Sequence, residues 1–137
     1  MTPPSSTPLQ GVVSIALGDF SVVRSQSLAL SDHLSDAEAT VQSMEDASPA
    51  KWHLAHTTWF FETFVLVPNV PDYTLFDENY GYLFNSYYDA VGERHPRPSR
   101  GMLARPALED GRAYRAHVDE AMEDLLAAKV DEELAAL

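Results

Sequence analysis

Residues 48–62 read SPAKWHLAHTTWFFE, and this stretch predicts an amphipathic helix. Ser48 is a suitable N-cap, and Pro49 suits the first helical position because the N–H that it lacks would have no partner there. Helical spacing places five side chains on one face: Trp52, His56, Trp59, Phe60 and Thr63. The helix is expected to run to about Leu66, before two prolines that follow shortly after it.

Helix signals also occur on both sides of this stretch. Residues 20–30 follow Asp19, a candidate N-cap, and their stripe at helical spacing consists of Phe20, Val23, Ser27 and Leu30. Residues 35–38 (SDAE) have the form of a capping box. Residues 107–128 predict a last long helix, whose buried stripe comprises Tyr114, Val118, Ala121, Met122 and Leu125. The fold class indicated is an all-α bundle.

Between these helices, residues 69–106 are rich in Pro, Gly, Asn and Asp. They predict a long ordered connection, interrupted by a short helical piece around residues 84–91. Loops of this length inside a compact domain usually carry function.

The two ends of the chain differ from the middle. Residues 1–10 contain three prolines, two serines and two threonines, and we interpret them as a disordered leader before a domain of residues 11–137. Val130, Leu134 and Leu137 follow helical spacing without a cap or a breaker behind them. They predict a new helix that the end of the chain cuts off, so the bundle would have up to four helices with the last one truncated.

Composition excludes several classes of function. Twenty-one acidic residues against nine basic ones give a net charge of −12, which argues against nucleic acid and disfavours anionic lipid as partners. No apolar run approaches the roughly 20 residues that span a bilayer, and no signal peptide is evident, so we expect a cytoplasmic protein without a membrane partner. The absence of cysteine excludes disulfides, thiolate metal sites and a cysteine nucleophile.

Histidines are the candidate metal ligands. His53 and His56 are three residues apart on the predicted helix, and neutral imidazole suits zinc or iron. The same spacing also fits one histidine at the edge of the core and one in solvent, so spacing leaves both interpretations open. His117 is expected at the border of an apolar stripe, and His33 and His95 are expected in loops.

A basic segment stands out in this acidic chain. Residues 94–105 contain four of the nine bases and no acid. Arg94, Arg97 and Arg100 recur every third residue and could hold a carboxylate or a phosphate by bidentate hydrogen bonds. They could equally pair with the protein's own acids, such as those of residues 119–124.

Three stretches together carry a family resemblance: residues 48–62, residues 81–101 (GYLFNSYYDAVGERHPRPSRG) and residues 114–122 (YRAHVDEAM). They resemble the N-terminal, DinB-like domain of the sulfoxide synthases of ergothioneine biosynthesis (EgtB-like proteins), from about Val22 to Ala128. The resemblance implies a helical bundle that supplies histidine ligands. A C-terminal domain like the formylglycine-generating enzyme would complete a non-haem Fe(II) site, where O2 is used to join cysteine or γ-glutamylcysteine to hercynine.

The resemblance also implies roles for individual residues. It assigns the first metal ligand to His56 rather than His53, and it assigns Arg97 and Arg100, more loosely, to the carboxylates of the thiol substrate. The family's other two ligands form an HxxxH pair on a later helix, and this chain contains no HxxxH. We therefore expect a partial metal-binding module, inactive alone, with no catalytic residue of its own and with the C-terminal domain as its missing partner.

Two other functions compete with this expectation. A DinB-like metal-dependent thiol S-transferase would need a complete histidine triad within the domain. A non-enzymatic interaction module would instead pair its terminal apolar stripe with a second copy, forming a homodimer that completes the bundle.

Overall fold

The computed structural model describes residues 6–86 and 92–135 of the chain, and within them it contains helices and no β-strand. The elements in order are α1 (Ser6–Ser31), α2 (Asp36–Thr40), α3 (Ala50–Phe61), the π-helical turn η1 (Glu62–Leu66), α4 (Val67–Asn69), α5 (Tyr80–Phe84), the 3₁₀-helix η2 (Arg97–Met102) and α6 (Leu108–Ala135). The predicted all-α bundle is confirmed. No helix in this part of the chain is long and apolar enough to cross a membrane.

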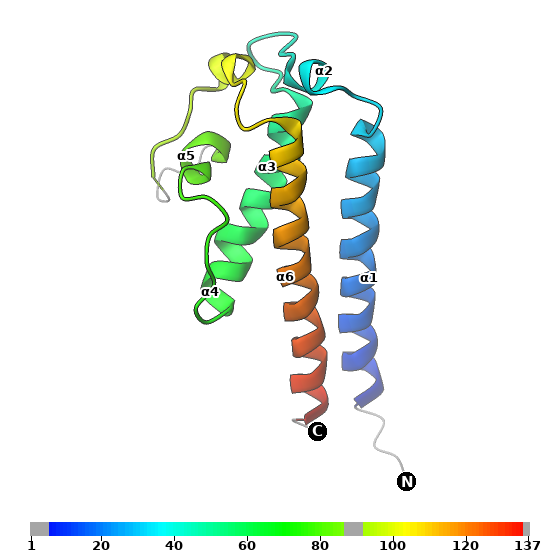
Figure 1. Cartoon of the computed structure of the whole chain (residues 1–137). Coiled ribbons are helices and arrows are strands. Elements are labelled where there is room, and N and C mark those ends of the chain that lie inside the picture. Colours follow the sequence, from blue (N-terminus) through cyan, green and yellow to red (C-terminus); the bar gives the residue numbers. More distant parts are fainter. Residues whose placement is uncertain (1–5, 87–91, 136–137) are drawn as a thin grey trace.

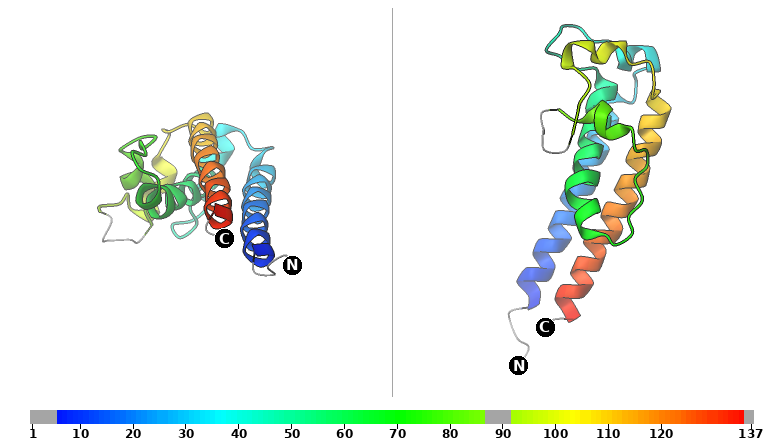
Figure 2. Two further views of the ribbon diagram at one scale, coloured as in Figure 1. Left: turned by 90° about the horizontal axis from the view of Figure 1, so that it is seen from below. Right: turned by 90° about the vertical axis from the view of Figure 1, so that its left-hand side faces the viewer.

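Helix α6 lies at the centre of the arrangement (Figure 1). It packs along α3 on one side and α1 on the other, whereas α1 and α3 contact each other little. The view from below in Figure 2 shows α1 at the edge of the molecule, with α6 beside it. Helix α2 and η2 lie at the end opposite to the two termini.

The core is largely aromatic and lies between α3, α5 and α6. Its buried members are Trp52, Ala55, Trp59, Leu66, Tyr80, Phe84, Tyr114, Val118 and Met122. The stripe predicted for the last helix is confirmed, since Tyr114, Val118 and Met122 are buried and Ala121 and Leu125 pack at their edge. This core fixes the relative positions of α3 and α5, which carry the candidate site.

A buried polar cluster joins the three long helices. The Arg24 side chain of α1 donates to Asp119 Oδ1 of α6 at 2.7 Å and to Thr58 Oγ1 of α3 at 2.6 Å. Arg115 of α6 donates to the Leu54 carbonyl at 2.9 Å and to the Arg24 carbonyl at 3.2 Å. Buried charges are tolerated when they are hydrogen-bonded in this way.

Both ends of the chain differ from the prediction. Residues 6–10, expected in a disordered leader, form the first turns of α1, which makes Asp19 an interior residue rather than an N-cap; residues 1–5 lie outside the described part. The prediction of a separate helix from Val130 is wrong, because α6 continues through residues 130–135. Residues 127–133 (AAKVDEE) contain no glycine or proline, so nothing in them interrupts the helix. Leu137 lies outside the described residues.

Smaller boundary errors concern the middle of the chain. Helix α3 begins at Ala50 with Pro49 in the N-cap position. Pro68 lies inside α4, which ends at Asn69, instead of following a helix end at about Leu66. The short helix of the connection spans residues 80–84 instead of 84–91, of which residues 87–91 lie outside the described part. The capping box is confirmed: Glu38 N donates to Ser35 Oγ at 3.1 Å, and Ser35 N donates to Glu38 Oε1 at 3.2 Å.

Candidate metal centre

The imidazole of His56 lies between two tryptophans on α3. It stacks on Trp52 with ring centroids 4.5 Å apart and planes inclined by 10°, and on Trp59 at 5.7 Å and 21°. Residues 52, 56 and 59 share one side of the helix because they are four and three positions apart. The two indoles restrict the imidazole to one plane.

A main-chain carbonyl determines which nitrogen of His56 carries the proton. Nδ1 lies 2.6 Å from the carbonyl oxygen of Phe84, the last residue of α5. A carbonyl only accepts, so Nδ1 is the donor, and in the neutral ring the lone pair is on Nε2. Histidine metal ligands are commonly oriented by such a bond from the second nitrogen.

Burial keeps this imidazole neutral. It lowers the pKa of His56, and the charges of Arg100 and His53 lower it further, against the opposing effect of the Phe84 carbonyl. A neutral imidazole is the form that binds a metal, because protonation occupies the ligating lone pair.

Helix α5 is held against α3 by its carbonyls. Trp52 Nε1 donates to the Leu83 carbonyl at 3.0 Å, one residue before the carbonyl that accepts from His56. Two consecutive carbonyls at the end of α5 therefore bind two side chains one helical turn apart on α3. The position of α5 thus sets the orientation of the His56 ring.

Arg100 is buried beside this site. Only 2 % of it is exposed, and its guanidinium lies 3.7 Å from the ring centroid of Trp52. It donates to Ser48 Oγ at 2.9 Å and to the Asn85 carbonyl at 3.4 Å, while Nε has no hydrogen-bond partner among the described residues. Burial, with the nearby charges of Arg97 and Arg94, lowers the pKa of Arg100 to about 10.

Arg97 is exposed, so the two arginines assigned together differ in their surroundings. Of the acids given as examples of internal partners for the basic segment, Asp119 pairs with Arg24. Both arginines and His53 are close enough to interact electrostatically: Arg100 and Arg97 lower the pKa of His53, after the larger effect of burial.

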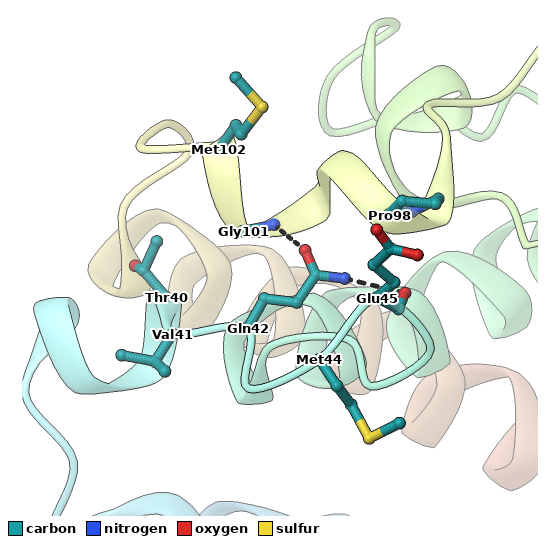
Figure 3. A pocket seen from close by; sticks show the side chains of 8 residues that line it. All are labelled: Thr40, Val41, Gln42, Met44, Glu45, Pro98, Gly101 and Met102. Carbon is teal, nitrogen blue, oxygen red and sulfur yellow. Dashed lines mark hydrogen bonds between the residues drawn. The ribbon is translucent and has the colours of Figure 1, made fainter.

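Gln42 holds η2, which carries Arg97 and Arg100, onto the segment after α2 (Figure 3). Its Oε1 accepts from Gly101 N at 2.6 Å, and its Nε2 donates to the carbonyls of Arg97 at 2.8 Å and Glu45 at 3.3 Å. A Cβ on Gly101 would lie 2.6 Å from the Gln42 Cβ, so glycine is required for this approach. The cavity of about 380 Å³ beside these bonds is rimmed by exposed Val41, Met44 and Met102.

The other histidines are placed as follows. His53 is exposed and meets the edge of Trp52 at 5.3 Å between centroids. His117 is exposed on α6 beside Tyr73 and Phe76, and His95 packs against Tyr82. Within residues whose side chains are described, no three His, Cys, Asp or Glu residues come together as a metal site.

Sequence reasoning missed a buried carboxylate in the π-helical turn. Glu62 is 2 % exposed and accepts from Tyr73 Oη at 2.7 Å, Tyr114 Oη at 2.9 Å and Phe76 N at 3.3 Å. The sequence feature that could have identified Glu62 is its position three residues after Trp59, because this spacing places an acid on the apolar face of the helix. π-helical turns inside α-helices are frequent at functional sites.

Comparison with known proteins shows the family of this chain. The model of the DinB superfamily matches residues 19–137, which is most of the chain. A search of curated proteins finds no match. The chain belongs to the DinB superfamily.

Proposed function

We propose that this chain is the iron-binding module of a sulfoxide synthase of the ergothioneine type, with His56 as one metal ligand. The observation that carries the proposal is the bond from His56 Nδ1 to the Phe84 carbonyl, which leaves a neutral, oriented Nε2 as a donor. Membership of the DinB superfamily and the motifs of residues 48–62 and 81–101 support it.

The chain's contribution is binding and orientation. His56 would hold Fe(II) with ligands from outside the described residues, and the metal would supply O2 chemistry for joining a cysteine-type thiol to hercynine. Trp52 and Trp59 would keep the imidazole in one plane, and the α5 carbonyl would keep the proton on Nδ1. The partner would be a domain like the formylglycine-generating enzyme, on the same or another chain.

The proposed carboxylate contacts on the thiol are Arg97 and Arg100. Arg97 is exposed and can turn toward a carboxylate. Arg100 would contribute its Nε–H, which has no partner in the described part of the chain. Since Arg100 is 2 % exposed, η2 would have to shift on binding.

Paramagnetic NMR tests the ligand assignment on the chain as it is. Titration with Mn²⁺ or anaerobic Fe²⁺ should broaden the ring signals of His56 at the lowest metal concentrations. His56→Ala should weaken metal binding about tenfold or more. His53→Ala, on the same helix, is the matched control and should bind nearly as well as the parent. Broadening of His53 or His117 before His56, or equal losses in both variants, would overturn the assignment.

Oxygen dependence tests the reaction class. Mixed with a partner domain, Fe(II), thiol and hercynine, the chain should support sulfoxide formation that stops when O2 is removed. A metal-dependent thiol S-transferase would not consume O2, so transfer under anaerobic conditions would favour that second candidate.

A further inference from the structure

Arg100 is a buried cation whose partners in the described part of the chain are neutral groups. Its guanidinium donates to the Ser48 hydroxyl and to the Asn85 carbonyl, and it lies over the ring of Trp52. Among the described residues it forms no salt bridge, and its Nε has no hydrogen-bond partner. The charges that act on it belong to two arginines of the same basic segment, and they repel it. Burial of a charge without a counter-charge is costly, so this position favours an anionic ligand.

Trp52 connects Arg100 with the candidate metal ligand. The guanidinium carbon lies 3.7 Å from the centroid of the Trp52 ring, and the imidazole of His56 stacks on the same indole with centroids 4.5 Å apart. Trp52 is 5 % exposed, so solvent screens the two groups from each other only weakly. The charge of Arg100 acts on the imidazole, because it lowers the pKa of His56. The same charge opposes the binding of a second cation, a metal ion, by His56.

The position of Arg100 in η2 favours a carboxylate as the anion. Side chains three residues apart eclipse each other in a 3₁₀-helix, so an anion bound by exposed Arg97 is brought next to Arg100. The planar guanidinium matches a carboxylate in shape and can donate two parallel hydrogen bonds to it. Residues 94–105 contain no acid that would compete for this position.

We propose that Arg100 couples two binding events: a carboxylate bound at η2 neutralises the guanidinium and thereby strengthens metal binding by His56. The carboxylate of the thiol substrate would thus favour occupation of the metal site. This inference rests on the proposed function, because it takes His56 as the metal ligand. Linkage makes the coupling reciprocal, so the metal would strengthen carboxylate binding by the same factor.

Mn²⁺ binding in the presence and absence of glutarate tests the coupling. Glutarate has two carboxylates and no thiol, so it cannot reach the metal through sulfur. At constant ionic strength, EPR of free Mn²⁺ gives the dissociation constant, corrected by the same titration without protein. For the parent chain this constant should fall about fivefold or more with glutarate. In the metal-free chain, glutarate should shift the NMR signal of the Trp52 indole N–H, because its carboxylate approaches the guanidinium over that ring.

Arg100→Gln separates coupling from structural support. The variant lacks the charge, so without glutarate it should bind Mn²⁺ about as tightly as the parent does with glutarate, and glutarate should add nothing. If Arg100 only supported Trp52, the same substitution would weaken Mn²⁺ binding. Arg100→Lys keeps the charge and should keep the weak affinity of the parent without glutarate. Arg105→Gln removes an equal charge from an exposed position of the same segment; it is the matched control and should behave like the parent.

The possible outcomes distinguish this inference from the ligand assignment. An unchanged Mn²⁺ affinity in glutarate, with His56 still the first residue broadened, overturns the coupling and leaves the assignment standing. Weaker Mn²⁺ binding by folded Arg100→Gln, as checked by circular dichroism, also overturns the coupling. So does a Trp52 indole signal that glutarate leaves unchanged in the metal-free parent, and this result depends on no variant. Absence of Mn²⁺ binding at His56 under both conditions overturns the assignment and the coupling together.

Discussion

His56 shows how a main-chain group sets the chemistry of a side chain. The Phe84 carbonyl, 28 positions away in the chain, accepts from Nδ1 and thereby leaves the lone pair of the neutral ring on Nε2. Burial lowers the pKa of the same imidazole. The guanidinium of Arg100 lies over the ring of Trp52. The carboxylate of Glu62 accepts hydrogen bonds from two tyrosine hydroxyls.

The lowered pKa of His56 predicts a dependence of stability on pH. Below its ordinary value of 6.5, the unfolded chain takes up a proton that the folded imidazole does not yet bind. The free energy of unfolding should therefore decrease as the pH falls from above 6.5 through the folded pKa. Urea unfolding of the parent chain and of His56→Gln over this pH range checks the prediction. The free energy of unfolding of the variant should depend less on pH than that of the parent. A titration midpoint of His56 above 6.5 by NMR would contradict the prediction.

Replacement of the Glu62 carboxylate should destabilise the protein. In Glu62→Gln an amide N–H₂ faces hydroxyl donors that need an acceptor, and the free energy of unfolding should fall by about 2–3 kcal/mol. Chemical denaturation measures the loss. The control Glu120→Gln, exposed on the same helix as Tyr114, should change stability by less than about 0.5 kcal/mol. Equal effects of both substitutions would show that the buried contacts contribute nothing.

At the scale of elements, sequence patterns succeeded where both partners of an interaction lie within a few residues. The capping box of α2 and the buried stripe of α6 follow from spacings of three and four residues, and both are confirmed. Helix ends were predicted less well, because helices continue as long as no residue stops them, and α1 and α6 are both longer than expected. In the stripe predicted for α1, Val23 and Leu30 are exposed whereas Phe20 packs against the core. Which of them is covered depends on the side of α1 that α6 occupies, and local periodicity contains no information on that.

The capping box predicts a loss of stability on removal of its serine. Ser35→Ala leaves the Glu38 N–H without its acceptor and should cost about 1 kcal/mol, measured by urea unfolding. Ser43→Ala, exposed in the following loop, is the control and should have little effect. A cost no larger than that of the control would mean that solvent replaces the cap fully.

For the molecule as a whole, the polar cluster around Arg24 joins α1, α3 and α6. Arg24 and Asp119 are 95 positions apart in the chain, and their side chains are 6 % and 21 % exposed. This cluster, and not only apolar contact, determines which side of α1 faces the bundle. Val22, Val23 and Leu30 of the same helix remain exposed.

Removing the carboxylate of this pair should destabilise the packing of α1. Asp119→Ala leaves the guanidinium of Arg24 buried without its counter-charge, and the free energy of unfolding should decrease by about 2–4 kcal/mol. Asp124→Ala, exposed on the same helix, removes the same charge and should change stability by less than about 0.5 kcal/mol. Thermal unfolding of both variants measures the difference, and similar melting temperatures would contradict the role given to the pair.

The sequence by itself determined the all-α class and the buried stripe of α6, since these depend on helical spacing, and its motifs indicated His56 as the candidate ligand. Tertiary structure decided the bond from His56 to the Phe84 carbonyl, the burial of Arg100 on Trp52, the contacts of Glu62 and the outward face of α1. The residues that make these contacts are mostly far apart in the chain. They come together only because packing of the whole molecule positions the connecting segments, such as residues 70–86 and 92–107, against the long helices.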